Sequence, residues 1–292
     1  MEAITREEKI MSGENLTPIT RKEMFLAKAA GQNIETPEPK TREEMFLSKI
    51  SGGGGNGGGG GESGDDTFSA EKYFEGNYPE VTLHNIKKLK AYAFYNDNVL
   101  TSINLPDGVT SIGANAFKGC SNLALTSLPS GITSIGANAF NDCSNLALKS
   151  LPNGIRYITD GAFSSCKKLK FISLPDSVTS IGSNAFNFCT QIALESLPSG
   201  VTYIGSGAFY NCAKLALTSL PSNVINISSS AFLGCTGLTT LTFEGTPNSI
   251  ANNAFSNCTN LKTINVPWAE GAVANAPWGA TNATINYNYT GE

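Results

Sequence analysis

The sequence has little of what an enzyme needs. Only one histidine, His84, occurs in 292 residues, and charged residues make up 15% of the chain. No HExxH, GxSxG or paired-carboxylate motif stands out. The glycine-rich run that begins at Ser51 has no strand before it and no Lys-Ser/Thr after it, so it is not a phosphate-binding loop. We therefore predict a protein that is not an enzyme and has no catalytic residue, metal site or cofactor.

Long hydrophobic runs and a strong charge of one sign are also missing. The net charge of −4 is too small to draw the chain to nucleic acid or to an anionic membrane. No apolar stretch approaches the roughly 18 residues of a transmembrane helix. The first residues, MEAITREEKI, lack the apolar core of a secretory signal. We predict no nucleic-acid partner and no membrane insertion, and we see no export signal.

The seven cysteines form no CxxC pairs, which would be typical of zinc sites. Their number is odd, which does not favour a complete set of disulfides. Instead, they recur at a constant interval of 23 residues, as Cys120, Cys143, Cys166, Cys189, Cys212, Cys235 and Cys258. Because free cysteine is among the most buried residue types, we predict a structural ladder of small buried side chains.

Other apolar positions keep the same 23-residue interval. The most regular are Phe94, Phe117, Phe140, Phe163, Phe186, Phe209, Phe232 and Phe255, and Ile112, Ile135, Ile158, Ile181, Ile204, Ile227 and Ile250. We call each such set of equivalent positions a column. Several apolar columns that share one period are typical of a solenoid, in which stacked copies bury a continuous core.

Within one copy, LKFISLP (Leu169 to Pro175) predicts a short strand, and SVTSIGSNAF (Ser177 to Phe186) predicts a second strand and a turn. The unit LxxIxLPxxVxxIGxxAFxxC resembles leucine-rich repeats of the BspA-like type over about residues 80–266. The resemblance implies a repeat solenoid of about eight 23-residue coils, built mainly of short β-strands. In the first copy Asp97 replaces the cysteine and the early half of the unit is missing, as in a terminal cap.

The period sets the boundaries of the ordered part. We assign 67–91 to an amino-terminal cap with the degenerate first coil, 92–266 to the solenoid and 267–292 to a carboxy-terminal cap. The last segment leaves the period, and its alternating ATINYNYT predicts a strand that closes the last coil.

Four copies depart from the unit at its inward isoleucine, where they have Thr126, Lys149, Glu195 and Thr218. Burying an unpaired charge there would cost several kcal/mol. We therefore predict a shifted register, in which these four side chains face solvent and the leucine before each one points inward. The alternative is an exposed leucine stripe that acts as an adhesive surface.

Residues 1–51 do not share the period and carry repeats of their own. Thr5, Thr20 and Thr41 each precede a glutamate by three residues, which is the capping-box pattern of a helix start. We predict three short α-helices that dock on a protein partner through Met24, Phe25, Leu26, Met45, Phe46 and Leu47. A partly disordered tail is the alternative. Residues 52–66 are glycine-rich and predict a flexible linker.

This amino-terminal segment is similar to the attachment segments of bacteriophage tail and fibre proteins, in which TRxEMFLAK-type repeats precede a hinge. That resemblance implies a virion-associated display protein that docks on a tail or baseplate protein. Its solenoid would bind a host-surface protein or glycan. The alternative is a bacterial cell-surface or secreted BspA-like adhesin, and an intracellular scaffold comes third. A homo-oligomer in the assembly is compatible with the sequence.

If the solenoid binds a ligand, the positions that vary between coils and face solvent are the candidates. They are Lys149, Glu195, Tyr157, Tyr203 and Tyr210. Aromatic side chains give a large contact area at a low cost in entropy. Tolerated surface variation is the alternative interpretation of these five positions.

Overall fold

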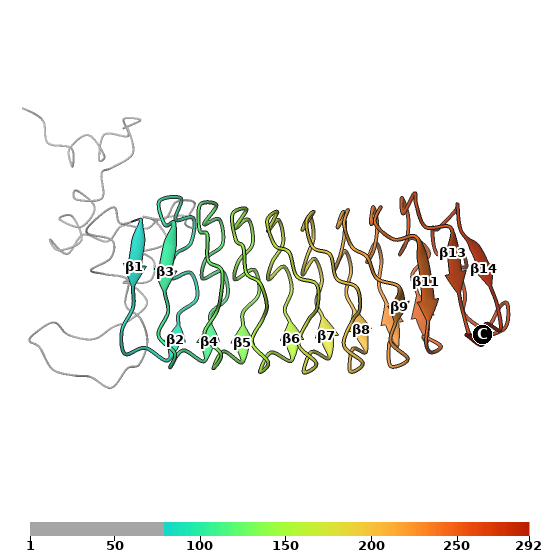
Figure 1. The fold of residues 1–292 in the computed structure, drawn as a ribbon, viewed down its shortest axis with the longest axis horizontal. Coiled ribbons are helices and arrows are strands. Elements are labelled where there is room, and N and C mark those ends of the chain that lie inside the picture. Colours follow the sequence, from blue (N-terminus) through green and yellow to red (C-terminus); the bar gives the residue numbers. More distant parts are fainter. Residues whose placement is uncertain (1–78, 292) are drawn as a thin grey trace, which may run out of the picture. The chain divides into compact units, whose positions relative to one another are not determined.

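The computed structural model describes residues 79–291, and all statements of structure below refer to them. They form a parallel β-solenoid of about nine coils of about 23 residues, which confirms the predicted fold class (Figure 1). The predicted helices of 1–51, the linker at 52–66 and the first part of the cap at 67–91 lie outside the described residues. The part of the chain that the structure describes contains no helix long and apolar enough to cross a membrane.

The first ladder of parallel strands runs through the middle of each copy. Its strands are β2 (Lys88–Leu89), β4 (Ser111–Ile112), β5 (Ser134–Ile135), β6 (Tyr157–Ile158), β7 (Ser180–Ile181), β8 (Tyr203–Ile204), β10 (Asn226–Ile227) and β12 (Ser249–Ile250). These strands pair in parallel with the equivalent residues of the next coil, as in Tyr157↔Ser180↔Tyr203, and form two sheets, β2-β4-β5 and β6-β7-β8-β10-β12. The second residue of each strand, Leu89 in β2 and an isoleucine in the others, points into the core because successive side chains of a strand alternate between its two faces.

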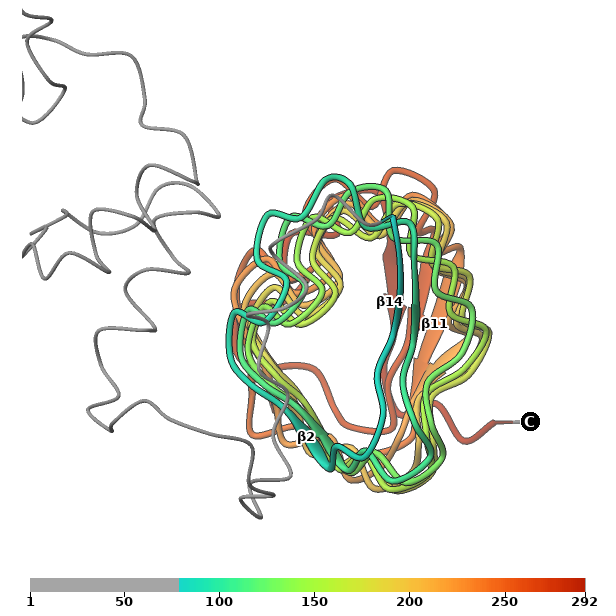
Figure 2. The same cartoon turned by 90° about the vertical axis from the view of Figure 1, so that its left-hand side faces the viewer.

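The second ladder lies on another side of the coils (Figure 2). Its strands are β1 (Glu80–Thr82), β3 (Ser102–Asn104), β9 (Ser219–Leu220), β11 (Thr240–Phe243), β13 (Thr263–Asn265) and β14 (Thr284–Asn286). The pairing of β1 with β3 shows that the first copy does have an early strand, so the prediction that its early half is missing was wrong. The ninth coil is at the other end, where β14 pairs with β13 beyond the eight predicted copies.

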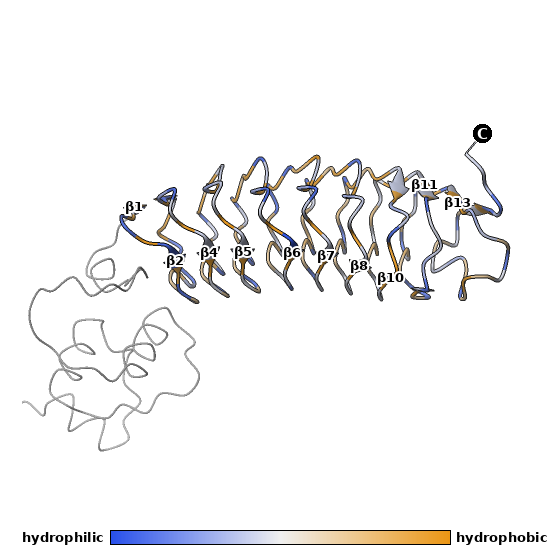
Figure 3. Cartoon of the chain, turned by 90° about the horizontal axis from the view of Figure 1, so that it is seen from below, coloured by the Kyte–Doolittle hydropathy of each residue, from blue (hydrophilic) through white to orange (hydrophobic). Residues whose placement is uncertain are grey.

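The core is a continuous stack of the predicted columns, with hydrophobic and hydrophilic segments alternating along each coil (Figure 3). Consecutive phenylalanine rings from Phe94 to Phe255 lie nearly parallel, with their centroids 5.1 to 5.7 Å apart. All seven cysteines are buried and free, as predicted. Each coil therefore completes its core only against its neighbours.

The carboxy-terminal cap closes this stack. The predicted closing strand is β14, which pairs in parallel with β13. Trp278 is fully buried, and its ring centroid lies 6.0 Å from that of Phe243 and 6.3 Å from that of Trp268. The carbonyl of Trp278 accepts the backbone N–H of Phe255 (2.9 Å), so the cap continues the bonding of the coils although its sequence leaves the period.

Asp97 ends the cysteine column at the amino-terminal side. It is fully buried, and its carboxylate accepts the backbone N–H groups of Val99 and Leu100, both at 3.1 Å. A carboxylate is stable in this buried place because backbone donors satisfy it.

Candidate functional site

The cysteine ladder has a structural role. Each thiol donates a hydrogen bond to the backbone carbonyl of the phenylalanine 26 residues earlier, at 2.8 to 3.1 Å. Burial raises the pKa of the Cys143 thiol far above its ordinary value, and that of Cys258 to about 12. A protonated, buried thiol is a hydrogen-bond donor and not a nucleophile. In addition, no group of three His, Cys, Asp or Glu residues in 79–291 could hold a metal ion.

The functional candidates therefore lie on the outer surface, where the predicted register shift is confirmed in three of the four coils. Leu148, Leu194 and Leu217 are buried, whereas Lys149 and Glu195 are exposed. In the first of the four coils Leu125 is only half-buried. Thr126 and Thr218 are exposed as well. The alternative of an exposed leucine stripe is wrong.

The structure shows the same register shift in one further coil, where the sequence does not indicate it. In LKFISLP, Phe171 is fully buried and Ile172 is 64% exposed, although the repeat unit places Ile172 in the inward column. The ring of Phe171 takes the inward position and packs edge-on against Phe163 and Phe186. The predicted strand at 169–175 was wrong, because the second ladder has no strand between β3 and β9.

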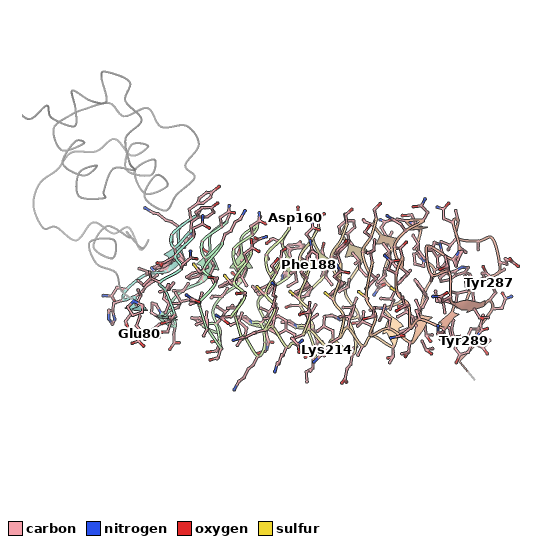
Figure 4. The ribbon with its side chains drawn as sticks, turned by 90° about the horizontal axis from the view of Figure 1, so that it is seen from above. Glu80, Asp160, Phe188, Lys214, Tyr287 and Tyr289 are labelled. Carbon is pink, nitrogen blue, oxygen red and sulfur yellow. The ribbon has the colours of Figure 1, made fainter. Side chains whose placement is uncertain are left out.

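A basic surface adjoins Ile172. We call it the lysine face, and it consists of Lys149, Lys167, Lys168, Lys170 and Lys214, all of them exposed. Lys168 and Lys170 lie on either side of the buried Leu169. Lys214 is in the column of Lys168 two coils on, and its ammonium donates to Gln191 Oε1 of the intervening coil (2.7 Å). Figure 4 shows Lys214 along one long edge of the solenoid and Asp160 along the other.

A second surface lies on the first ladder, and we call it the tyrosine face. Tyr157 on β6 and Tyr203 on β8 are 62% and 37% exposed, and the small Ser180 of β7 lies between them. Ser228 Oγ lies 3.3 Å from the hydroxyl of Tyr203 and donates to it. Ile225, 43% exposed, precedes β10 on the same ladder.

The third candidate surface is a turn that contains Phe188. The equivalent turn residues of the other coils are Asn, Gly, Asp or Ser in the left-handed conformation, but here the residue is Phe188. Phe188 has a φ of 56° and is 42% exposed, and its ring lies 5.4 Å from that of Tyr210. A bulky residue in this conformation is rare. The sequence analysis missed Phe188, although its place in a column of Asn, Gly, Asp and Ser was visible.

The structure thus divides the five predicted ligand-binding residues among three places. Lys149 and Glu195 share a column on either side of Ile172, with Lys149 in the lysine face. Tyr157 and Tyr203 share the tyrosine face, and Tyr210 contacts Phe188. Their roles in binding stay predictions.

Two comparisons agree with this architecture. A model of the BspA type leucine-rich repeat region matches residues 67–193 and 191–270. A leucine-rich repeat protein from Bacteroides ovatus is 24% identical and has a TM-score of 0.50, and the match covers 71% of this chain and 60% of that protein. The chain therefore spans less than two thirds of that structure, and the likeness shows the fold alone. No curated protein matches the chain.

Two further solved structures are similar at lower scores. A leucine-rich repeat protein of T. pallidum is 29% identical with a TM-score of 0.40, and the match covers 64% of this chain and 79% of that protein. A leucine-rich cell surface protein of Faecalibacterium prausnitzii is 20% identical with a TM-score of 0.42, and the match covers 74% of this chain and 89% of that one.

Proposed function

Because the chain belongs to the BspA-type leucine-rich repeat family, we propose that it is an adhesin-type binding protein of a bacterial cell surface. On this proposal it has no catalytic activity. Its solenoid presents side chains from successive coils to a protein or glycan of another surface. The family match over residues 67–193 and 191–270 favours this function over virion display, for which the comparisons give no support.

One observation carries the proposal. The large hydrophobic residues that are exposed in the described part of the chain all fall between residues 157 and 225. They are Tyr157, Ile172, Phe188, Tyr203 and Ile225. The core columns are nearly constant from coil to coil, whereas large hydrophobic residues are exposed only in these central coils, on the tyrosine face, at Ile172 and at the Phe188 turn. Such a concentration of exposed apolar side chains is typical of a binding region.

Bead adhesion tests the proposal. Beads coated with the full chain should be retained on epithelial cell layers or on immobilised extracellular-matrix proteins. The variant Tyr157→Ser, Ile172→Ser and Tyr203→Ser should lose most of this retention while its thermal unfolding is unchanged. A control with Ser134→Ala, Asn248→Ala and Thr281→Ala, at exposed positions in other coils, should be retained normally. Equal retention of both variants would contradict the proposal.

Antibody labelling tests the location separately. Antibodies to the solenoid should label intact cells of the source bacterium. Labelling of purified phage particles, with no labelling of cells, would instead support virion display. In that case the docking of residues 1–51 on a tail or baseplate protein becomes the function to pursue.

A further inference from the structure

We infer that the lysine face, together with the adjoining Ile172, binds an extended acidic segment of a partner protein that carries an apolar side chain among its carboxylates. This inference rests on the proposed binding function and names the chemistry of its ligand. It is carried by charge, by the exposure of Ile172 and by the arrangement of the surrounding columns.

The charge of the solenoid is unevenly distributed. Residues 79–291 contain 11 Lys and Arg and nine Asp and Glu, and five of the 11 lie in the lysine face. Lys168 and Lys214 are two coils apart, about 10 Å at the usual strand spacing. Lys167, Lys168 and Lys170 lie in one coil, with Lys149 in the coil before it and Lys214 two coils further on. Such a cluster of cations attracts a polymer that has several carboxylates, and it does so most strongly at low salt.

The exposed side chain of Ile172 favours a polypeptide partner over a polyanion that is charged but has no apolar side chain. Ile172 is the most exposed large hydrophobic residue of the described chain, at 64%. A sulfated polysaccharide offers no aliphatic group to cover it, whereas a polypeptide can place a leucine or phenylalanine there. We therefore favour an acidic polypeptide over an anionic glycan.

Glu195 sets the direction of the surface. Lys149, Ile172 and Glu195 occupy the same position in three successive coils. The backbone N–H of Glu195 donates to the carbonyl of Ile172 (3.3 Å). An acidic partner is attracted on the Lys149 side and repelled on the Glu195 side. Removing this one carboxylate should therefore strengthen binding, which is a change that damage to the fold would not produce.

The probe is a fluorescent peptide in which one leucine is flanked on both sides by glutamates, titrated with the full chain at low salt. Replacing that leucine with serine should weaken binding. Ile172→Ser in the protein should weaken it about tenfold, the effect of partly covering one isoleucine. Thermal unfolding of each variant checks that the solenoid is intact.

The charge variants complete the design. Lys168→Ser with Lys170→Ser should weaken binding and flatten its salt dependence. Lys262→Ser, an exposed lysine in the column of Lys170 four coils further on, should change nothing. Glu195→Gln should strengthen binding by two- to threefold, roughly the effect of one exposed charge.

Three results would overturn the inference. The first is that the acidic peptide does not bind. The second is that its affinity is unchanged both by Ile172→Ser and by Lys168→Ser with Lys170→Ser. The third is that a heparin oligosaccharide binds with the same affinity as the peptide and that Ile172→Ser does not change this affinity. If these occur while coated beads still adhere, only the ligand assignment fails. If the beads do not adhere at all, the proposed function fails.

Discussion

Replacing Cys143 separates the two roles that the structure gives to the cysteine ladder. Its thiol fills a buried site and donates to the Phe117 carbonyl at 3.0 Å. Cys143→Ala removes the sulfur and its hydrogen bond. The lost bond should cost about 1 kcal/mol, and the remaining cavity about 1 to 2 kcal/mol. We expect a loss of about 2 to 3 kcal/mol in the free energy of unfolding, by adding these two costs.

Cys143→Ser is the matched variant, because its hydroxyl keeps a donor in the same place. Part of the loss should be recovered, so that the serine variant is about 1 kcal/mol more stable than the alanine variant. Denaturant unfolding of the full chain, followed by circular dichroism, gives both values at an unchanged m-value. A serine variant no more stable than the alanine variant would refute the hydrogen-bonding role. An alanine variant as stable as the wild type would refute both roles.

Three further predictions concern the ends of the ladder and the surface. Asp97→Ala removes the acceptor of the buried Leu100 N–H and of the half-buried Val99 N–H, and it should lower the free energy of unfolding by about 2 kcal/mol. Asp97→Asn keeps an acceptor oxygen and should cost less in the same denaturant assay. The pKa of Cys258 is raised from 9.0 to about 12 by burial, so its stabilisation is complete below pH 9 and is lost as the pH rises toward 12. Stability measured above pH 9 should therefore fall, by about 1.4 kcal/mol per pH unit for this thiol, and Cys258→Ala should fall less steeply. Phe188→Gly should be more stable than Phe188→Ala by about 1 kcal/mol in thermal unfolding, because only glycine adopts the left-handed conformation without strain; equal stability would contradict that reason.

The period of the sequence predicts most of the fold because each coil repeats the same packing problem. The phenylalanine, isoleucine and cysteine columns appear in the structure at the predicted depth. The prediction failed where two neighbouring residues are both apolar and either of them could point into the core. Phe171 and Ile172 are both apolar, so the pattern alone does not say which one points inward, and the fit of an aromatic ring between Phe163 and Phe186 decides it.

The ends and the surface were less predictable for a different reason. The strand β1 lies outside the period because its pairing with β3 is offset by 22 residues, as in Val81↔Ile103. The hydrogen bonds of the thiols could not be derived from the spacing, since they depend on where the carbonyl of the previous coil points. The sequence analysis found only Lys149 of the lysine face, through its register, because nothing in the 23-residue unit distinguishes Lys167, Lys168 and Lys170.

The most direct test of the central claim is the retention of coated beads, compared between the wild type and the variant Tyr157→Ser, Ile172→Ser and Tyr203→Ser. The account predicts that the wild type and the control at Ser134, Asn248 and Thr281 adhere equally, and that the central variant does not. Adhesion of the central variant at the level of the wild type would show that the central coils are not the binding surface.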